Sequence, residues 1–167
     1  TIATPIYVTP TADNAGEKIA VDGDYLFVTA GQKIYRYLKS SGAYDGEWGI
    51  AGTGENEYGE ISSIDADSDY VVITDSVLNR VTICSQAGGF LRKIEFSENI
   101  TDAATHSGIV YVPSASGIHE YSAASGEKIR TWADYGEGEG KITGPCLISA
   151  GPDSVFASNG KVVKKFA

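Results

Sequence analysis

A degenerate internal repeat with a period of about 40 residues is the feature that most limits how this chain can fold. Four short segments share a run of β-branched and aromatic residues that is typical of strands; they are residues 25–29, 70–74, 109–113 and 154–158. One repeat position within them is taken by Val28, Ile73, Val112 and Phe156, which are 45, 39 and 44 residues apart. This spacing predicts a chain built from similar, stacked units.

Each segment is followed by a turn and by a second apolar segment in the same register. Its matching positions are Ile34 with Tyr37, Val81 with Cys84, Ile118 with Tyr121, and Val163 with Phe166. Turn glycines come next in three units, at Gly42, Gly89 and Gly126. Two units then have a tryptophan in one shared position, as Trp48 and Trp132.

A further short apolar strand precedes each of these patterns, at residues 19–21, 61–64, 100–105 and 146–149. The unit is therefore expected to contain four antiparallel strands. No window of the sequence has a convincing helical period. Units of about 40 residues with four strands each predict an all-β, four-bladed β-propeller.

The chain is expected to form one domain, with blade one at residues 17–60, blade two at 61–99, blade three at 100–144 and blade four at 145–167. Blade four then has only three strands. The N-terminal segment 1–10 belongs to no unit and is the expected fourth strand, with closure residues Ile2, Pro5, Ile6, Tyr7 and Val8. Prolines suit an outermost strand, where fewer ladder bonds are needed. This strand either closes the chain's own ring or pairs with blade four of a neighbouring molecule.

One unit carries a more specific motif in residues 64–81, where Asp75, Asn79, Arg80 and Val81 follow the first strands. This unit resembles the NHL repeat, whose blades have an Asp, an Asn-Arg pair and a following Val at this spacing. The other units have Ala30, Ser114 and Ser158 near the Asp position. The resemblance implies a propeller over the whole chain, although six blades are usual for NHL repeats.

Charge narrows the range of partners. The chain has 13 Lys and Arg against 22 Asp and Glu, a formal net charge of -9, which disfavours nucleic acid and anionic membranes. A basic protein or further copies of the chain itself are the expected partners. No stretch is long and apolar enough to insert in a membrane. The absence of Met and the Ser, Thr, Gly and Tyr content favour a processed protein outside the cell, at its surface or in a virion.

Two acidic, glycine-rich loops are the candidate binding surface. They lie at residues 51–60 and 134–140, and their candidate contact residues are Glu55, Glu57, Tyr58, Glu60, Asp134, Tyr135, Glu137 and Glu139. In a four-bladed ring the loops of blades one and three are expected to oppose each other across one mouth. They then bind a cationic group or a basic partner. The alternative is that both are ordinary connections between blades.

Residues with catalytic or metal-binding chemistry are few. Asp65, Asp67 and Asp69 alternate as in a calcium loop, but without its Gly and its distant Glu, so a solvated turn is the simpler expectation. Some NHL-like propellers are metal-dependent lyases or lactonases, which need more His than His106 and His119 supply. Cys84 and Cys146 are expected to be free and buried. Neither a catalytic residue nor a cofactor is expected.

The sequence thus predicts a non-catalytic, extracellular or surface-displayed propeller that acts as a protein-interaction or self-assembly module. Two alternatives remain. One is a structural subunit of a fibre or viral appendage, joined to its neighbours by exchange of the N-terminal strand. The other is a small metal-dependent lyase or lactonase of the NHL-like type.

Overall fold

The computed structural model describes residues 17–134, 136–143 and 146–166, and every regular element in them is a β-strand. Blade one consists of β1 (Lys18–Asp22), β2 (Tyr25–Ala30), β3 (Lys33–Leu38) and β4 (Tyr44–Trp48). Blade two consists of β7 (Ile61–Ala66), β8 (Tyr70–Asp75), β9 (Arg80–Ser85) and β10 (Phe90–Glu95). The described residues include no helix that could cross a membrane.

Blade three consists of β11 (Ala104–His106), β12 (Ile109–Ser114), β13 (Gly117–Ser122) and β14 (Lys128–Trp132). Blade four has three described strands, β15 (Leu147–Gly151), β16 (Ser154–Ser158) and β17 (Val163–Phe166). All strands within a blade pair antiparallel in sequence order. A feature that was not expected is the short parallel pair of β5 (Ile50–Ala51) and β6 (Glu57–Tyr58), which lies in the connection from blade one to blade two.

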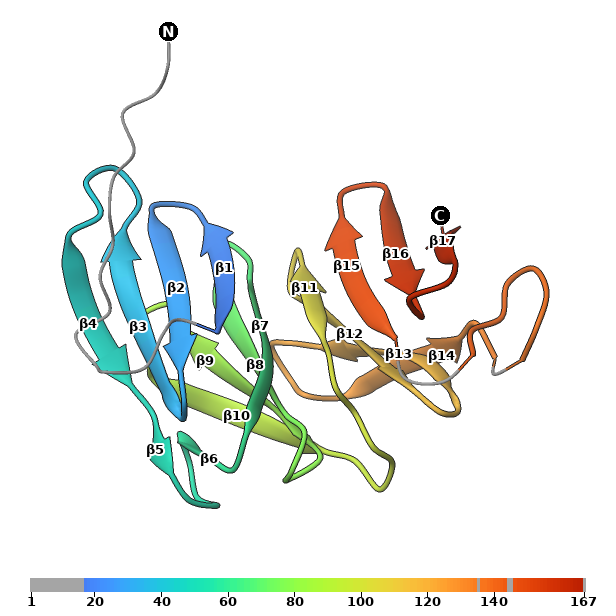
Figure 1. Ribbon diagram of the computed structural model, residues 1–167, viewed down its shortest axis with the longest axis horizontal. Helices are drawn as coiled ribbons and strands as arrows, with labels where there is room; N and C mark the ends of the chain where they lie inside the picture. The colour runs from blue at the N-terminus through green and yellow to red at the C-terminus, as the bar shows by residue number, and fades with distance from the viewer. Residues whose placement is uncertain (1–16, 135, 144–145, 167) are drawn as a thin grey trace, which may run out of the picture.

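The four sheets are arranged as the blades of a four-bladed β-propeller (Figure 1). Their inner strands pack in chain order, β1 against β7, β7 against β11, and β11 against β15. No comparable packing joins β15 back to β1 within the described part of the chain. Figure 1 shows β1 and β15 well separated, with β11 between them in this view. The prediction of an all-β propeller is confirmed.

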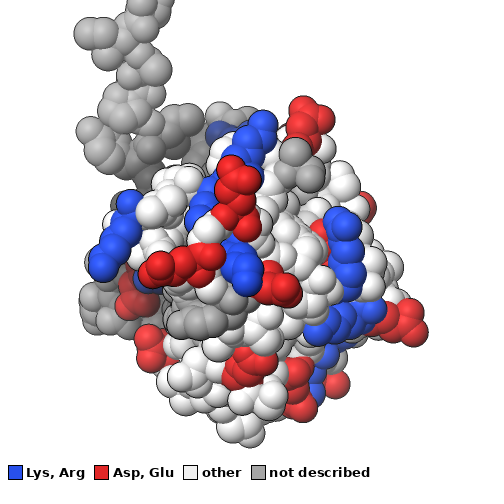
Figure 2. Space-filling view, turned by 90° about the vertical axis from the view of Figure 1, so that its right-hand side faces the viewer, with Lys and Arg blue, Asp and Glu red and all other residues white. Residues whose placement is uncertain are grey.

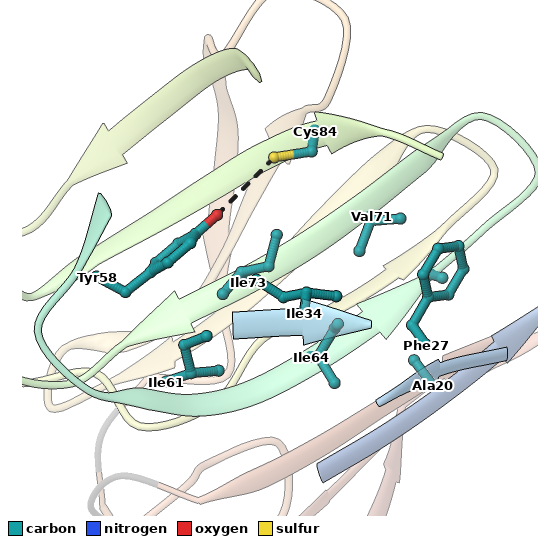
Figure 3. Close-up of a cluster of buried hydrophobic side chains, with 10 residues drawn as sticks. Ala20, Phe27, Ile34, Tyr58, Ile61, Ile64, Val71, Ile73 and Cys84 are labelled. Atoms are coloured by element: carbon teal, nitrogen blue, oxygen red, sulfur yellow. Dashed lines mark hydrogen bonds between the residues drawn. The ribbon is translucent and has the colours of Figure 1, made fainter. Parts of the chain in front are cut away.

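Hydrophobic cores lie between successive blades because each strand alternates its side chains between the two sheet faces. Phe27 and Ile34 of blade one meet Ile64, Val71 and Ile73 of blade two (Figure 3). Equivalent clusters join blade two to blade three and blade three to blade four. Full burial of one such Ile or Phe contributes about 1.5–3 kcal/mol, so these cores hold the blades together.

The strand register corrects one sequence assignment. The repeat position of Val28 in β2 and Val112 in β12 is occupied in β16 by Ala157, not by Phe156, because Ala157 is the fourth residue after the preceding turn. A shift of one residue along a strand places the side chain on the opposite face of the sheet. Phe156 therefore lies on the face of blade four that points away from blade three, and its side chain is exposed.

The expected tryptophan position is confirmed, since Trp48 pairs with Ile34 and Trp132 pairs with Ile118. The turn glycine of blade two is Gly88, not Gly89, because Gly88 has the positive φ of +83°. A Cβ on Gly88 would lie 2.6 Å from the Trp48 ring. Glycine is needed there both for the backbone conformation and to let blade one approach.

Candidate functional site

A groove with a volume of about 1710 Å³ lies between blade three and blade four. On one side lie Tyr111, Glu120, Arg130 and Trp132 from β12, β13 and β14. On the other side lies β17, with Phe166. The groove thus follows the outer edge of blade four.

The groove exists because blade three has four described strands and blade four only three. In blade one, Trp48 of the outermost strand lies against the β9–β10 turn of the next blade, at Gly88. Trp132 occupies the same position of blade three, but the described part of blade four has no outermost strand to meet it. Its ring instead packs edge-on against Phe166, with 4.8 Å between ring centroids.

Glu120 organises the polar side of the groove. Its carboxylate accepts two hydrogen bonds from Arg130, at 2.7 Å from Nε and 2.9 Å from Nη2. A third comes from Trp132 Nε1 at 2.8 Å. The Glu120 side chain is buried, whereas the Arg130 side chain is largely exposed. The hydrogen bond to Glu120 raises the pKa of the Arg130 guanidinium.

Lysines line the other wall. Lys164 Nζ donates to the carbonyls of Gly138 at 2.7 Å and Lys141 at 2.5 Å, which ties the loop after β14 to β17. Lys161 and Lys165 also line the groove. Figure 2 faces the side of the molecule that carries blades three and four, and it shows basic and acidic residues interspersed. The groove is therefore mixed in charge and partly aromatic.

The strand β17 has a described partner on one side only. It pairs with β16 from Val155↔Phe166 to Ser158↔Val163. Its other edge has no described strand beside it. The segment expected to fill this position, with Ile2, Pro5, Ile6, Tyr7 and Val8, lies outside the described residues.

The acidic loop of blade one is built around internal contacts. Glu57 Oε2 accepts hydrogen bonds from the backbone amides of Thr53 and Gly54 at 2.9 and 2.8 Å. Arg80 of blade two donates to the carbonyls of Thr53 and Gly54 at 2.7 and 3.0 Å, and also to Glu57 O. The NHL-like Arg80 thus holds this loop in place.

Tyr58 is not a surface residue, which corrects its assignment as a contact. Its ring is fully buried in the core between blades one and two, with the hydroxyl 4.0 Å from Cys84 Sγ (Figure 3). The β5–β6 pair turns this side chain inward. Glu55 and Glu60 remain exposed.

The structure does not bring the two acidic loops together. Residues 51–60 lie at one end of the molecule and the loop after β14 at the other (Figure 1). Only the second loop lines the groove, through Glu137 and Glu139. Asp134 is exposed, and Tyr135 lies outside the described residues. The described blades spread along an arc, so blades one and three do not face each other across a shared mouth.

Asp65 and Asp67 join blades two and three, which corrects the expectation of a turn with solvated acids. Asp67 Oδ2 accepts from Thr105 Oγ1 and from the Gly108 amide, both at 2.9 Å. Asp65 Oδ2 accepts from the Thr105 amide at 2.8 Å. Asp69 is exposed. No group of three or more His, Cys, Asp or Glu in the described ranges is placed to hold a metal.

A polar cluster on blade three escaped the sequence reasoning, because its members are brought together only by the β12–β13 and β13–β14 pairings. His119 Nε2 lies 2.8 Å from Ser114 Oγ and 3.2 Å from Ser116 Oγ, while Nδ1 lies 2.8 Å from Thr131 Oγ1. Burial lowers the pKa of His119. Nucleophilic catalysis of the Ser-His type needs a group that orients the imidazole. Here the group at His119 Nδ1 is the Thr131 hydroxyl. The nearby Glu98 carboxylate accepts a hydrogen bond from Ser116 Oγ instead of one from the imidazole.

No protein-family model matches the sequence, and no curated protein matches it. Among solved structures, the chain is similar to the computationally designed Ika4 protein, with a TM-score of 0.68 and 16% identity over 99% of this chain and 98% of that chain. It is similar to U3-55K with a TM-score of 0.73 and 13% identity, over 93% of this chain and 50% of that chain. For the WD40 domain of Pan2 from Neurospora crassa, the TM-score is 0.64 and the identity 12%, over 92% of this chain and 47% of that chain.

The chain therefore spans about half the length of the last two proteins. Identities this low establish the β-propeller fold alone. A β-propeller is compatible with a protein-interaction module, since the fold presents its loops and edges on a rigid scaffold. Any more specific function depends on the residues of the site and not on the fold.

Proposed function

We propose that this protein is a non-catalytic interaction module of the cell exterior or surface, and that it binds an extended polypeptide segment along β17. The supporting observation is the groove beside that strand, which blade three walls with Trp132 and Tyr111. Addition of a strand would satisfy the free main-chain groups of β17. Pockets along the groove would select its side chains.

The chain's own segment 1–10, or the same segment of a neighbouring copy, is the proposed occupant. Ile2, Ile6 and Val8 would share one face of an extended strand, which suits packing of that face on the blade. The lysines of β17 disfavour a highly basic segment, and residues 1–10 contain no Lys or Arg. Binding within one chain gives a closed module, and binding between chains gives self-assembly.

A peptide-binding experiment tests this proposal. A variant lacking residues 1–10 is mixed with a peptide of the sequence Thr1 to Pro10. Trp132 is made the sole tryptophan by Trp48→Phe, so that its fluorescence reports on the groove. The expected result is saturable binding with a blue shift of the emission. If the truncated chain is unfolded alone, recovery of β-sheet circular dichroism on peptide addition is the same positive result.

Two controls sharpen the test. The variant Trp132→Phe leaves Trp48 as the reporter, and its emission should not shift because Trp48 lies between blades one and two. A peptide with Ile6→Asp and Val8→Asp should not bind. The proposal fails if the matched peptide leaves Trp132 unchanged and the truncated chain has the same urea midpoint and mass as the full chain.

A further inference from the structure

The first and last blades of the described chain each have an apolar sheet face that no other blade covers. We call the sheet face that a blade packs on the next blade along the chain its forward face, and the opposite sheet face its rear face. Phe27 and Ile34 belong to the forward face of blade one, and Ile64 and Ile73 to the rear face of blade two. Three such joints are formed, and none joins blade four to blade one in the described residues.

The rear face of blade one has the residues of a joint. Ile19 pairs with Val28 just as Ile64 pairs with Ile73 and Ile148 pairs with Ala157. The three isoleucines thus share one repeat position. Ile64 and Ile148 are 7% and 8% exposed, whereas Ile19 is 65% exposed. Val21 beside it is also exposed. On the β3 part of the same face Tyr35 and Tyr37 are already buried, so the open part of the face is that of β1.

The forward face of blade four repeats this contrast. Ile34, Val81, Ile118 and Val163 occupy one position of the third strand, each opposite the same site on the second strand. The first three are fully buried by the next blade, and Val163 is 68% exposed. Phe156 and Leu147 are exposed on the same face. Large apolar patches of this kind are uncommon on isolated domains.

We propose that a second copy of this chain covers both faces. Blade four of each copy packs its forward face on the rear face of blade one of its partner, which closes a two-fold ring of two chains with four blades each. The new joints then bury Ile19 and Val163 at the repeat positions where Ile64 and Ile34 are buried inside the chain. A head-to-tail contact of this type closes into a ring when the rotation per subunit permits it.

The shape of the chain supports a ring of two. Its four blades superpose on about half of U3-55K and about half of the Pan2 WD40 domain, with 93% and 92% of this chain covered. Such coverage is what half of a larger propeller would give, whereas the designed Ika4 protein is matched over 98% of its own length. Two copies give about eight blades, within the usual range of propellers. The proposal goes beyond strand binding at β17, because it depends on the sheet faces and not on segment 1–10.

Mass in solution tests the ring. Light scattering after size exclusion should give about 35 kDa, twice the 17.6 kDa of one chain. Ile19→Asp on blade one and Phe156→Asp with Val163→Asp on blade four should each give a species of 17.6 kDa that keeps its β-sheet circular dichroism. Val77→Asp is the control, because Val77 is an exposed turn residue of blade two. It should leave the dimer intact.

Mixing the two monomeric variants gives a sharper result. In a head-to-tail ring, the mixed dimer places both changes in one joint and leaves the other joint intact. Dimers should therefore reappear in the mixture, although neither variant dimerises alone. A monomeric wild-type chain, a linear polymer, or the absence of recovery in the mixture would overturn the ring. Loss of peptide binding at β17 with an intact dimer would instead count against the proposed function alone.

Discussion

Asp67 in the turn that follows β7 accepts a hydrogen bond from Thr105 Oγ1 of β11 at 2.9 Å, which joins blade two to blade three at the inner strands. The same carboxylate binds the Gly108, Asp69 and Tyr70 amides. Asp67 is buried, and its two carboxyl oxygens accept hydrogen bonds from four donors. This side chain is therefore a structural link between blades.

Asp67→Ala should lower the free energy of unfolding by about 2–4 kcal/mol, because it leaves several buried donors without an acceptor. Asp69→Ala, two residues away and exposed, is the matched control and should change it by less than about 0.5 kcal/mol. Urea unfolding followed by tryptophan fluorescence measures both. Equal effects of the two changes would show that Asp67 does not link the blades.

Asp65 and Asp102 should make stability depend on pH in an unusual direction. Burial raises the pKa of both carboxyls. An acid with a higher pKa in the folded chain stabilises the fold most below its unfolded pKa of about 3.9, and this contribution is lost as the pH rises through the folded value. The stability of the wild type relative to Asp102→Asn should therefore fall as the pH rises from about 3.9 through the raised pKa of the folded chain.

Urea titrations at a series of pH values measure this difference. Asp153→Asn, at an exposed turn, is the matched control variant. A difference for Asp102→Asn that grows with pH would mean that the two backbone hydrogen bonds of Asp102, from Ala103 N and Ile148 N, outweigh its burial.

Gly88→Ala should destabilise the packing of blade one on blade two and lower the unfolding temperature. The new methyl group would lie 2.6 Å from the Trp48 ring, at a backbone φ of +83°. Backbone strain of about 1–2 kcal/mol and overpacking of about 1–3 kcal/mol add together there. Gly160→Ala has nearly the same φ, +82°, with no atom within 4 Å, and should show the backbone cost alone. Thermal unfolding should place the Gly88 variant clearly below the Gly160 variant.

The two thiols should be unreactive in the folded chain. Burial raises the pKa of Cys84 to about 12 and that of Cys146 to about 11. The thiolate is the reactive form, so at pH 8 labelling by a disulfide reagent should be slower by a hundredfold or more, on the order of the shift from a free pKa of about 8.5. Addition of urea should restore full reactivity. Rapid labelling of Cys146→Ser before unfolding would show that Cys84 is accessible.

The β-strands, their antiparallel order and the blade-two turn follow from local pattern. Short continuous runs of apolar residues predict strands that are buried on both faces. The spacing of Asp75 and Arg80 identifies the turn that connects β8 and β9. Local sequence also placed Trp48 and Trp132 correctly, because both are counted from a turn within their own hairpin. These features depend only on residues close together in the chain.

The contacts of the candidate site could not be predicted from the sequence, because they join residues that are far apart in the chain. The position of Tyr58 in a glycine-rich loop predicts a surface contact, but β6 turns its side chain into a core that residues of two blades form. Asp65 and Asp67 have the spacing of solvated turn residues, yet their partners Thr105 and Gly108 lie about forty residues further along the chain. The groove beside β17 arises from two blades together, so no single segment encodes it.

By itself, the sequence determined that the chain forms repeated four-stranded units with apolar faces, because strand alternation and turn chemistry are local. Only the tertiary structure decided which of these faces are covered. Ile19 and Ile64 have the same residue type and the same strand position, yet one is exposed and the other buried. Burial requires a neighbouring blade on that side, and the placement of a neighbour is a property of the assembled fold.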